Sequence, residues 1–264
     1  MNFSPDRQLF THGVKAFEDN YIWLINKVNS KNIVIVDPGD STPVLEYVNA
    51  HHFTPVAILV THHHADHIAG INGILKYFKI PVFGPGNENI HAITHAVQEG
   101  EMINLDAINA RFQVMAVPGH TRGHVAYYGQ GMLFCGDTLF AGGCGRIFEG
   151  TPTQMYESLE KIRHLPDETL IFCSHEYTQD NLYFARVVEP DNPALLDRIK
   201  NTATLRQQHL PTVPSTLELE KQTNPFLRCH LPNVTQAAET FALKTIKSGA
   251  DTFSMVRYWK DTLD

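Results

Sequence analysis

The stretch Thr61-His62-His63-His64-Ala65-Asp66-His67 places four histidines and an aspartate within seven residues. It follows the apolar run Val56–Val60, which has the length of a buried strand, and precedes the apolar-periodic segment Ile68–Phe78, which predicts a helix. Imidazole and carboxylate groups gathered at the end of a strand are typical of a metal site.

Three further residues of the same kind each follow a predicted strand: His120 after Phe112–Val117, Asp137 after Met132–Cys135 and His175 after Thr169–Cys173. Together with His62, His64, Asp66 and His67 they are too many to surround one ion, so the sequence predicts two ions. A carboxylate is the side chain best able to bridge two metals, and we expect Asp137 to do so. Spacing alone does not assign the other ligands to one ion or the other.

Imidazole and carboxylate without thiolate suit zinc, with iron or manganese as alternatives, and predict an open catalytic site rather than a closed structural one. An isolated histidine is more often structural than ligating. The clustered spacing argues against that interpretation for the four candidates between Thr61 and His67. We expect His63 to point away from the metals, and the structural interpretation is kept for His12, His51, His52, His91, His95, His124, His164, His209 and His230.

Composition describes an ordinary globular protein of 264 residues, with 43% hydrophobic and 19% charged residues. The apolar runs are far shorter than the roughly 20 residues of a membrane span, so no membrane partner is expected. Met1–Phe10 lacks the apolar core of a secretory signal, which predicts a cytoplasmic location. The net charge of −7 argues against a broad nucleic-acid interface, because phosphate binding usually needs a basic excess.

The four cysteines are sparse and form no C-x-x-C pair, so we expect reduced core thiols rather than a disulfide framework.

The pattern of elements changes near Thr178. Before it, short strands alternate with turns, a helix is expected near Pro43 with Ser41 or Thr42 as its cap, and residues 87–115 look irregular up to the strand that begins at Phe112. After it, prolines separate three predicted helices, Asn181–Val188, Ala194–His209 and Thr235–Ser248. The sequence therefore predicts an α/β domain over residues 1–177 and an all-α domain over residues 178–264.

The motif H-x-H-x-D-H after an apolar strand, with P-G-H at 118–120, G-D-T at 136–138 and S-H-E-Y at 174–177, resembles the metallo-β-lactamase superfamily. Within it, the chain is similar nearly end to end to the glyoxalase II, or hydroxyacylglutathione hydrolase, family. The segments that carry this second resemblance are Phe17–Trp23, Val36–Gly39, Phe134–Phe140, Gly143–Arg146, Asn224–Phe226 and Arg257–Asp261.

The resemblance implies a four-layer αββα sandwich followed by a helical substrate-binding domain. It also implies how seven ligands divide between two divalent metal ions. His62, His64 and His120 would hold one ion, Asp66, His67 and His175 the other, and Asp137 would bridge them.

The implied reaction is hydrolysis of S-D-lactoylglutathione to D-lactate and glutathione, the second step of methylglyoxal detoxification. A metal-bridging hydroxide would attack the thioester carbonyl, with Asp66 and Asp137 as the catalytic carboxylates. Arg146, Tyr177, Arg257 and Lys260 would bind the glutathione part. Many members have lysine and tyrosine where this chain has Arg146 and Phe148, so any hydrogen bond from that tyrosine is absent or replaced here.

The resemblance leaves rival interpretations. An iron-dependent glutathione persulfide dioxygenase has a similar fold, but Asp66, His67 and the long helical region favour a binuclear hydrolase. A nuclease of the same superfamily is disfavoured by the net charge of −7, because nucleic-acid binding usually needs a basic excess. A metal-binding protein without catalysis would have little reason to keep an open site of mixed ligands. The expected protein is a monomer whose partner is a small glutathione thioester.

Overall fold

The computed structural model describes residues 8–263; residue 264 and residues 1–7, which include most of the Met1–Phe10 stretch used to predict location, lie outside the described residues. The chain forms two compact units. Of the described residues, unit 1 comprises 8–116 and 123–136, and unit 2 comprises 117–122 and 137–263. The domain boundary after residue 177 stays a prediction.

Unit 1 contains two sheets. The first runs in the order β1 (Leu9–Ala16), β2 (Asn20–Lys27), β3 (Asn32–Val36), β4 (Thr54–Leu59), β5 (Val82–Pro85) and β6 (His95–Val97). Its first three strands pair antiparallel, whereas β3 to β6 pair parallel. The second sheet has the antiparallel order β10 (Met132–Gly136), β9 (Val125–Gly129), β8 (Ala110–Ala116) and β7 (Met102–Leu105). The 3₁₀ turn η1 (Asp106–Ile108) joins β7 to β8.

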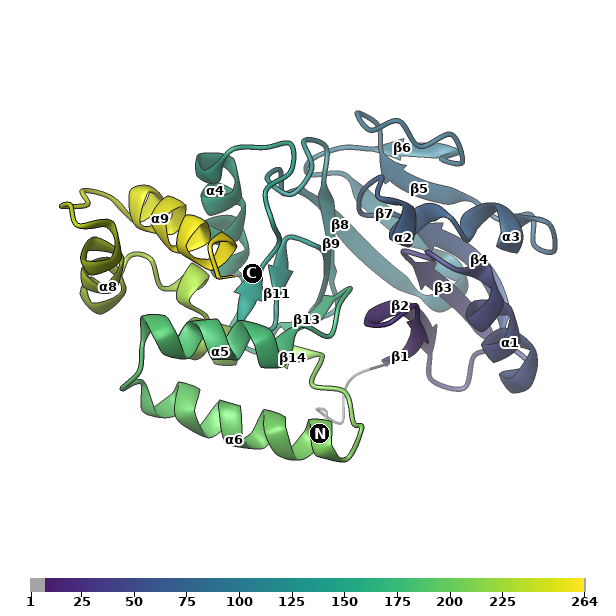
Figure 1. Cartoon of the computed structure of the whole chain (residues 1–264). Helices are drawn as coiled ribbons and strands as arrows, with labels where there is room; N and C mark the ends of the chain where they lie inside the picture. The colour runs from purple at the N-terminus through teal and green to yellow at the C-terminus, as the bar shows by residue number, and fades with distance from the viewer. Residues whose placement is uncertain (1–7, 264) are drawn as a thin grey trace. The chain divides into compact units, whose positions relative to one another are not determined.

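A helical layer covers one face of the first sheet, formed by α1 (Ser41–His51), α2 (Ala65–Ile68) and α3 (Ile71–Leu75) (Figure 1). Val44 and Val48 of α1 and Ile71 and Ile74 of the α3 segment pack against buried residues of β3 and β4. Because β3 and β4 are parallel, their carboxyl ends lie at the same edge of the sheet. Residues that follow these two strands can therefore meet.

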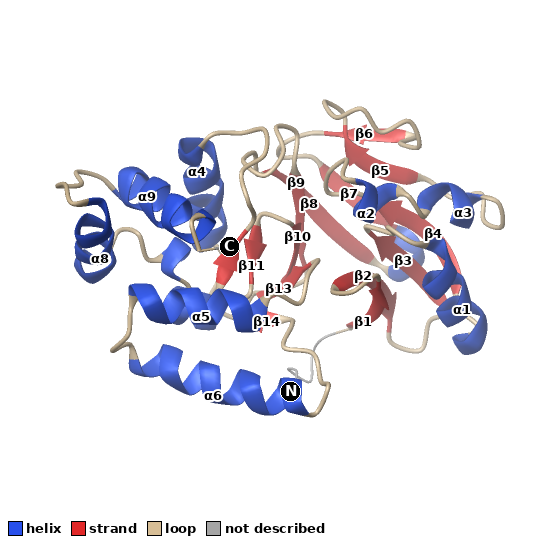
Figure 2. Cartoon of the chain, in the orientation of Figure 1, coloured by secondary structure: helices blue, strands red, loops and turns tan. Residues whose placement is uncertain are grey.

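Unit 2 is mainly helical. Its helices are α4 (Pro152–Arg163), α5 (Thr178–Val188), α6 (Pro193–Gln207), α7 (Leu217–Thr223), α8 (Pro232–Ala242) and α9 (Gly249–Asp261), with the 3₁₀ turn η2 (Pro225–Leu227). It also contains a hairpin of β11 (Leu139–Phe140) and β12 (Gly143–Cys144), and the pair β13 (Leu170–Cys173) with β14 (Ser215–Thr216). After β14 the described chain is only helix and loop (Figure 2). No helix within residues 8–263 is both long and apolar enough to cross a membrane.

The predicted fold class, an α/β sandwich followed by an all-α region, is confirmed. Four local predictions are wrong. The cap of α1 is Asp40, whose carboxylate accepts from the Thr42 N–H, rather than Ser41 or Thr42. The predicted helix Ile68–Phe78 is instead two short helices broken at Gly70, because the Gly70 N–H donates to the Pro38 carbonyl outside the helix. Residues 87–115 contain β6, β7 and most of β8 rather than irregular chain.

The last predicted helix also differs, since α8 ends at Ala242 and a separate helix α9 begins at Gly249. The four cysteines are buried and unpaired by disulfides, as predicted. Burial raises the pKa of the Cys144 thiol to about 11 and that of Cys173 to about 12, so both are protonated at neutral pH.

Tyr127 joins the second sheet to the end of β4. Its hydroxyl donates to the Val60 carbonyl at 2.6 Å, and the neighbouring Val125 N–H donates to the Thr61 carbonyl at 2.9 Å. Burial, and the nearby Asp37 charge, raise the pKa of Tyr127 well above its ordinary value, so the hydroxyl keeps its proton as a donor. These bonds fix the backbone at the start of the histidine stretch.

We predict that Tyr127→Phe lowers the free energy of unfolding by about 1–2 kcal/mol, because the buried Val60 carbonyl loses its donor. Urea denaturation monitored by circular dichroism measures the change. Tyr128→Phe, at the adjacent and half-buried position, is the matched control and should stay within about 0.5 kcal/mol of the unsubstituted protein. Equal effects at the two positions would contradict the role given to the Tyr127 hydroxyl.

Candidate metal centre

Asp37 organises the histidine stretch from the end of β3. Its Oδ1 accepts from the Thr61 N–H at 2.8 Å, and its Oδ2 accepts from the Thr61 hydroxyl at 2.7 Å and from His67 Nδ1–H at 3.1 Å. The carboxylate is buried, and charge-assisted hydrogen bonds of this kind offset the cost of burying it. Asp37 therefore sets both the backbone before His62 and the tautomer of His67.

A second contact holds α2 against the turn after β3. A side chain at Gly39 would collide with the backbone of Asp66, so only glycine lets α2 approach this closely. The Gly70 N–H donates to the Pro38 carbonyl at 2.9 Å. The Asp66 carboxylate in turn accepts from Asn20 Nδ2 at 2.9 Å, which fixes one of its oxygens.

His120 is held by the segment 146–149 within unit 2. Its Nδ1–H donates to the Arg146 carbonyl at 2.7 Å, and its own carbonyl accepts from the Phe148 and Glu149 N–H groups at 3.2 and 3.3 Å. The Phe148 ring meets the imidazole edge to face, 5.2 Å between centroids. Because Nδ1 carries the proton, Nε2 is the atom of His120 that offers a lone pair.

Asp137, which follows β10, lies between two histidines of unit 2. Its Oδ2 is 3.4 Å from His120 Nε2 and 3.4 Å from His175 Nε2. These separations exceed the usual 2.7–3.2 Å of a hydrogen bond. They match the edge of a tetrahedron around an ion with bonds of about 2.0–2.1 Å, which is about 3.3–3.4 Å.

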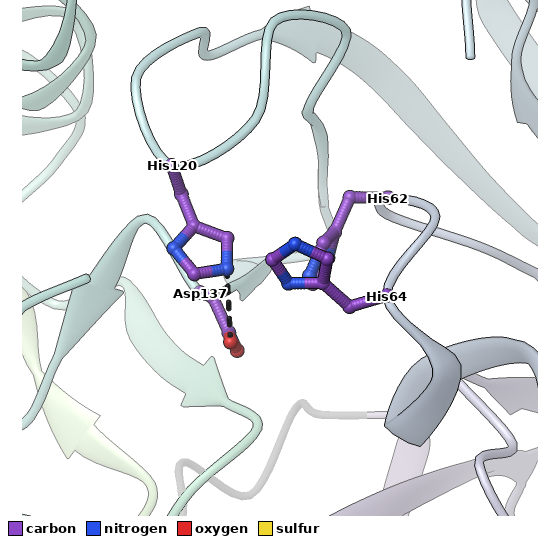
Figure 3. Close-up of side chains that lie close together, drawn as sticks. All are labelled: His62, His64, His120 and Asp137. Carbon is purple, nitrogen blue, oxygen red and sulfur yellow. Dashed lines mark ion pairs between the residues drawn. The ribbon is translucent and has the colours of Figure 1, made fainter. Parts of the chain in front are cut away.

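The seven predicted ligands fall into two groups in the structure. In the first, His62, His64, His120 and Asp137 each offer one ligand atom, and these atoms lie within 4.8 Å of one another (Figure 3). In the second, Asp66, His67 and His175 meet the same criterion. The assignment of these residues to two metal ions stays a prediction.

The donor set fits divalent metal ions. The Thr61 hydroxyl gives its hydrogen to Asp37, so His62 Nδ1–H donates to Thr61 Oγ1 at 3.1 Å, and His62, like His67 and His120, is left with Nε2 as the ligand atom. Hydrogen bonds from the other ring nitrogen are the usual support of a metal-binding histidine. No thiolate enters either group.

The four predicted substrate-binding residues are all in unit 2. The guanidinium of Arg146 is half exposed, with Nε 3.4 Å from Asp261 Oδ1, and Arg257 donates to the same oxygen at 2.9 Å. Arg257 is only 4% exposed and Lys260 8%. The Tyr177 ring stacks on the His175 ring, 4.7 Å between centroids. As predicted, Arg257 and Lys260 lie on one helix, α9.

Several supporting residues were missed by sequence reasoning. Asp37 and Thr61 lie in quoted motifs, but neither was given a role. Glu88 accepts from His63 Nδ1–H and from the Gly123 N–H, both at 3.0 Å, and so links His63 to the segment that begins at Gly123. His124 stacks on His62 with 4.6 Å between ring centroids. The sequence contains one local indication that His124 lies near the metal centre, its H-x-x-x-H spacing from His120.

Two family models match the chain, and together they cover most of it. Residues 17–175 match the metallo-beta-lactamase superfamily. Residues 176–263 match the hydroxyacylglutathione hydrolase C-terminus.

Curated relatives match over nearly their whole length. A hydroxyacylglutathione hydrolase of Nitrosomonas europaea is 48% identical over 248 residues, 94% of this chain and 94% of the relative. One of Photobacterium profundum is 50% identical over 255 residues, 96% of this chain and 99% of the relative. Among solved structures, ETHE1 from Myxococcus xanthus superposes with a TM-score of 0.66 and 24% identity, covering 95% of this chain and 91% of that one. This last likeness concerns the fold alone.

We predict that Asp37→Asn weakens metal binding by about 10- to 100-fold, because an amide cannot accept all three hydrogen bonds that orient Thr61 and His67. Competition with a chromophoric chelator measures the affinity. The matched control is Asp40→Asn, where asparagine still caps α1 and affinity should be unchanged. An unaltered affinity in Asp37→Asn would refute the role of this carboxylate.

Proposed function

We propose that this chain, which belongs to the hydroxyacylglutathione hydrolase family of the metallo-β-lactamase superfamily, cleaves S-D-lactoylglutathione to D-lactate and glutathione at a pair of divalent metal ions. The observation that carries the proposal is the pair of adjacent donor groups, with one Asp137 oxygen equidistant from a histidine of each. This arrangement supports Asp137 as the bridging ligand. Zinc is the ion that the donor types favour, with iron or manganese as alternatives.

The remaining ligands divide as the two groups do. We assign His62, His64 and His120 to one ion and Asp66, His67 and His175 to the other. Two ions held there would lower the pKa of a bound water towards neutrality and polarise a carbonyl oxygen. The protein holds the proposed ligands in place through Asp37, Asn20 and the Arg146 carbonyl. The ligand side chains therefore need not reorganise during the reaction.

The leaving group of a thioester needs little help from protein side chains to depart. A thiol with a reference pKa of about 8.5 can depart as thiolate, so a dedicated general acid is dispensable. The Asp66 side chain is 39% exposed, so solvent can reach its carboxylate. Its primary role is to ligate.

Glutathione carries two carboxylates, and the cations of unit 2 are suited to them. Arg146 and Arg257 converge on Asp261, which holds the two guanidinium groups near each other. Lys260 and Tyr177 complete the proposed set. Phe148 is 61% exposed and lies edge-on to His120, so it offers an apolar face where many family members have a tyrosine hydroxyl.

The presence of two donor groups favours a binuclear hydrolase over a mononuclear persulfide dioxygenase. The cytoplasmic location and the monomeric state stay predictions.

We expect the metal-loaded protein to release glutathione from S-D-lactoylglutathione, measured as loss of thioester absorbance, and to lose this activity on chelation. Asp137→Ala should lose turnover and metal together, because one ligand serves both sites. Undetectable hydrolysis by protein shown by elemental analysis to hold two ions would refute the proposed function. Oxygen consumption with glutathione persulfide would indicate the dioxygenase instead.

We expect Lys260→Met to raise KM by about 10-fold or more with little change in kcat, because it removes a cation that binds a remote carboxylate and keeps the buried stem. Steady-state kinetics with metal content measured in parallel tests this. Lys247→Met, at an exposed position, is the control and should leave both constants unchanged. A normal KM for Lys260→Met would exclude Lys260 from the substrate site.

A further inference from the structure

The segment 137–146, here called the ligand hairpin, links two parts of the proposed metal centre. It begins with Asp137, the proposed bridging ligand, and ends with Arg146, whose carbonyl fixes the tautomer of His120. Between them lie β11 and β12, joined by Ala141 and Gly142. Any displacement of this hairpin would move both a ligand and the support of another ligand.

The ligand hairpin has little regular structure of its own. Its two strands have two residues each and pair only as Leu139 with Cys144 and Phe140 with Gly143. An isolated hairpin, even with longer strands, is marginally stable at best in water. Something else must hold it in place.

Side chains from the helices bond the hairpin backbone at successive residues. Asn224 Nδ2 donates to the Phe140 carbonyl at 3.2 Å and to the Gly143 carbonyl at 2.9 Å. Asn181 Nδ2, from α5, donates to the Ala141 carbonyl at 3.2 Å. Glu220, from α7, accepts from the Gly142 N–H at 2.8 Å.

A fourth contact comes from α9. Arg257 donates from one terminal nitrogen to the Cys144 carbonyl at 3.1 Å, while the other donates to Asp261. Five backbone groups between residues 140 and 144 are therefore bonded by side chains of the C-terminal helical region.

These side chains are themselves fixed. Glu220 and Asn224 are fully buried and Asn181 is 3% exposed. Glu220 also accepts from Ser215, from Asn224 and from Arg198, whose guanidinium bonds Thr223 as well. A buried polar network whose members are satisfied is rigid, because any displacement leaves a polar group without a partner in a low dielectric.

The hairpin sequence is adapted to these contacts. Gly142 has φ +72°, a left-handed conformation that favours glycine. A side chain at Gly143 would come within 2.6 Å of Asn181 Nδ2. Glycine at both positions lets the helices reach the backbone directly.

We propose that Asn181, Glu220 and Asn224 are positioning residues for the metal centre, so that the helical region following residue 178 sets metal affinity as well as substrate binding. The inference rests on the proposed metal centre, since it assigns a role toward Asp137 and His120. It gives Arg257 a contact with the hairpin in addition to its proposed contact with substrate. None of these residues is assigned to ligate metal.

The test compares two Asn→Asp substitutions in the full chain. Asn224→Asp keeps the oxygen that accepts from the Phe226 N–H but removes the amide nitrogen that donates to the Phe140 and Gly143 carbonyls and to Glu220. Asn192→Asp makes the same change at a half-buried position, where it removes one bond, from Nδ2 to the Gln222 carbonyl at 2.9 Å, and also keeps its capping oxygen. Zinc affinity is measured by chelator competition, and the Tm of metal-free protein is measured in parallel.

We expect Asn224→Asp to bind zinc about 10- to 100-fold more weakly and Asn192→Asp to bind it normally. A purely structural role would lower the metal-free Tm without changing zinc affinity. If Asn224→Asp does not fold, Asn181→Asp, which loses a single donor, should show a loss of about fivefold. Unchanged affinity in the folded variants overturns the inference.

Metal binding and thioester hydrolysis, measured on the unsubstituted protein, distinguish failure of this inference from failure of the proposed function. Failure of that protein to bind zinc, iron or manganese would refute the metal centre and, with it, the inference. Binding of two ions without thioester hydrolysis would refute the proposed reaction only, because the affinity comparison does not depend on turnover.

Discussion

The Asp37 carboxylate is the interaction on which the histidine stretch depends. Parallel pairing of β3 with β4 brings the residues after these strands to one edge, and Asp37 there receives hydrogen bonds from the Thr61 backbone, the Thr61 hydroxyl and His67. Asp37 has φ +51°, a conformation that aspartate tolerates better than most residues. A buried carboxylate with three donors fixes the direction of the ligands without being one of them.

A different arrangement supports the ligands of unit 2. His120 is oriented by a backbone carbonyl, and Asp137 begins a hairpin whose backbone is bonded by buried side chains from the helices. Both arrangements are rigid for the same reason. A buried polar group without a hydrogen-bond partner is costly, so only the geometry that satisfies every group is stable. The helical region is therefore more than an added surface for substrate.

Arg257 illustrates how the same residue can serve two purposes. Arg257 has the features of a structural cation, since it is buried and donates to the Cys144 carbonyl and to Asp261. Arg146, which pairs with the same aspartate, is half exposed. Desolvation lowers the pKa of Arg257, but the nearby Cys144 and Asp261 more than offset this, so its pKa is raised and the charge is retained. The Asp261 carboxylate is therefore the fixed counterion of the Arg257 guanidinium.

The sequence by itself determined the ligand types, their places at strand ends and the change from α/β to helical structure, because each depends on local spacing and periodicity. It did not determine that Asp37 would orient His67 from 30 residues away, or that Asn224 would bond the Phe140 carbonyl from 84 residues away. The sequence also did not determine the helix break at Gly70, because that break depends on a hydrogen bond from the Gly70 N–H to the Pro38 carbonyl, 32 residues away. Only the tertiary structure decides such contacts, because a hydrogen bond to a distant backbone group leaves no periodic pattern in the residues around either partner.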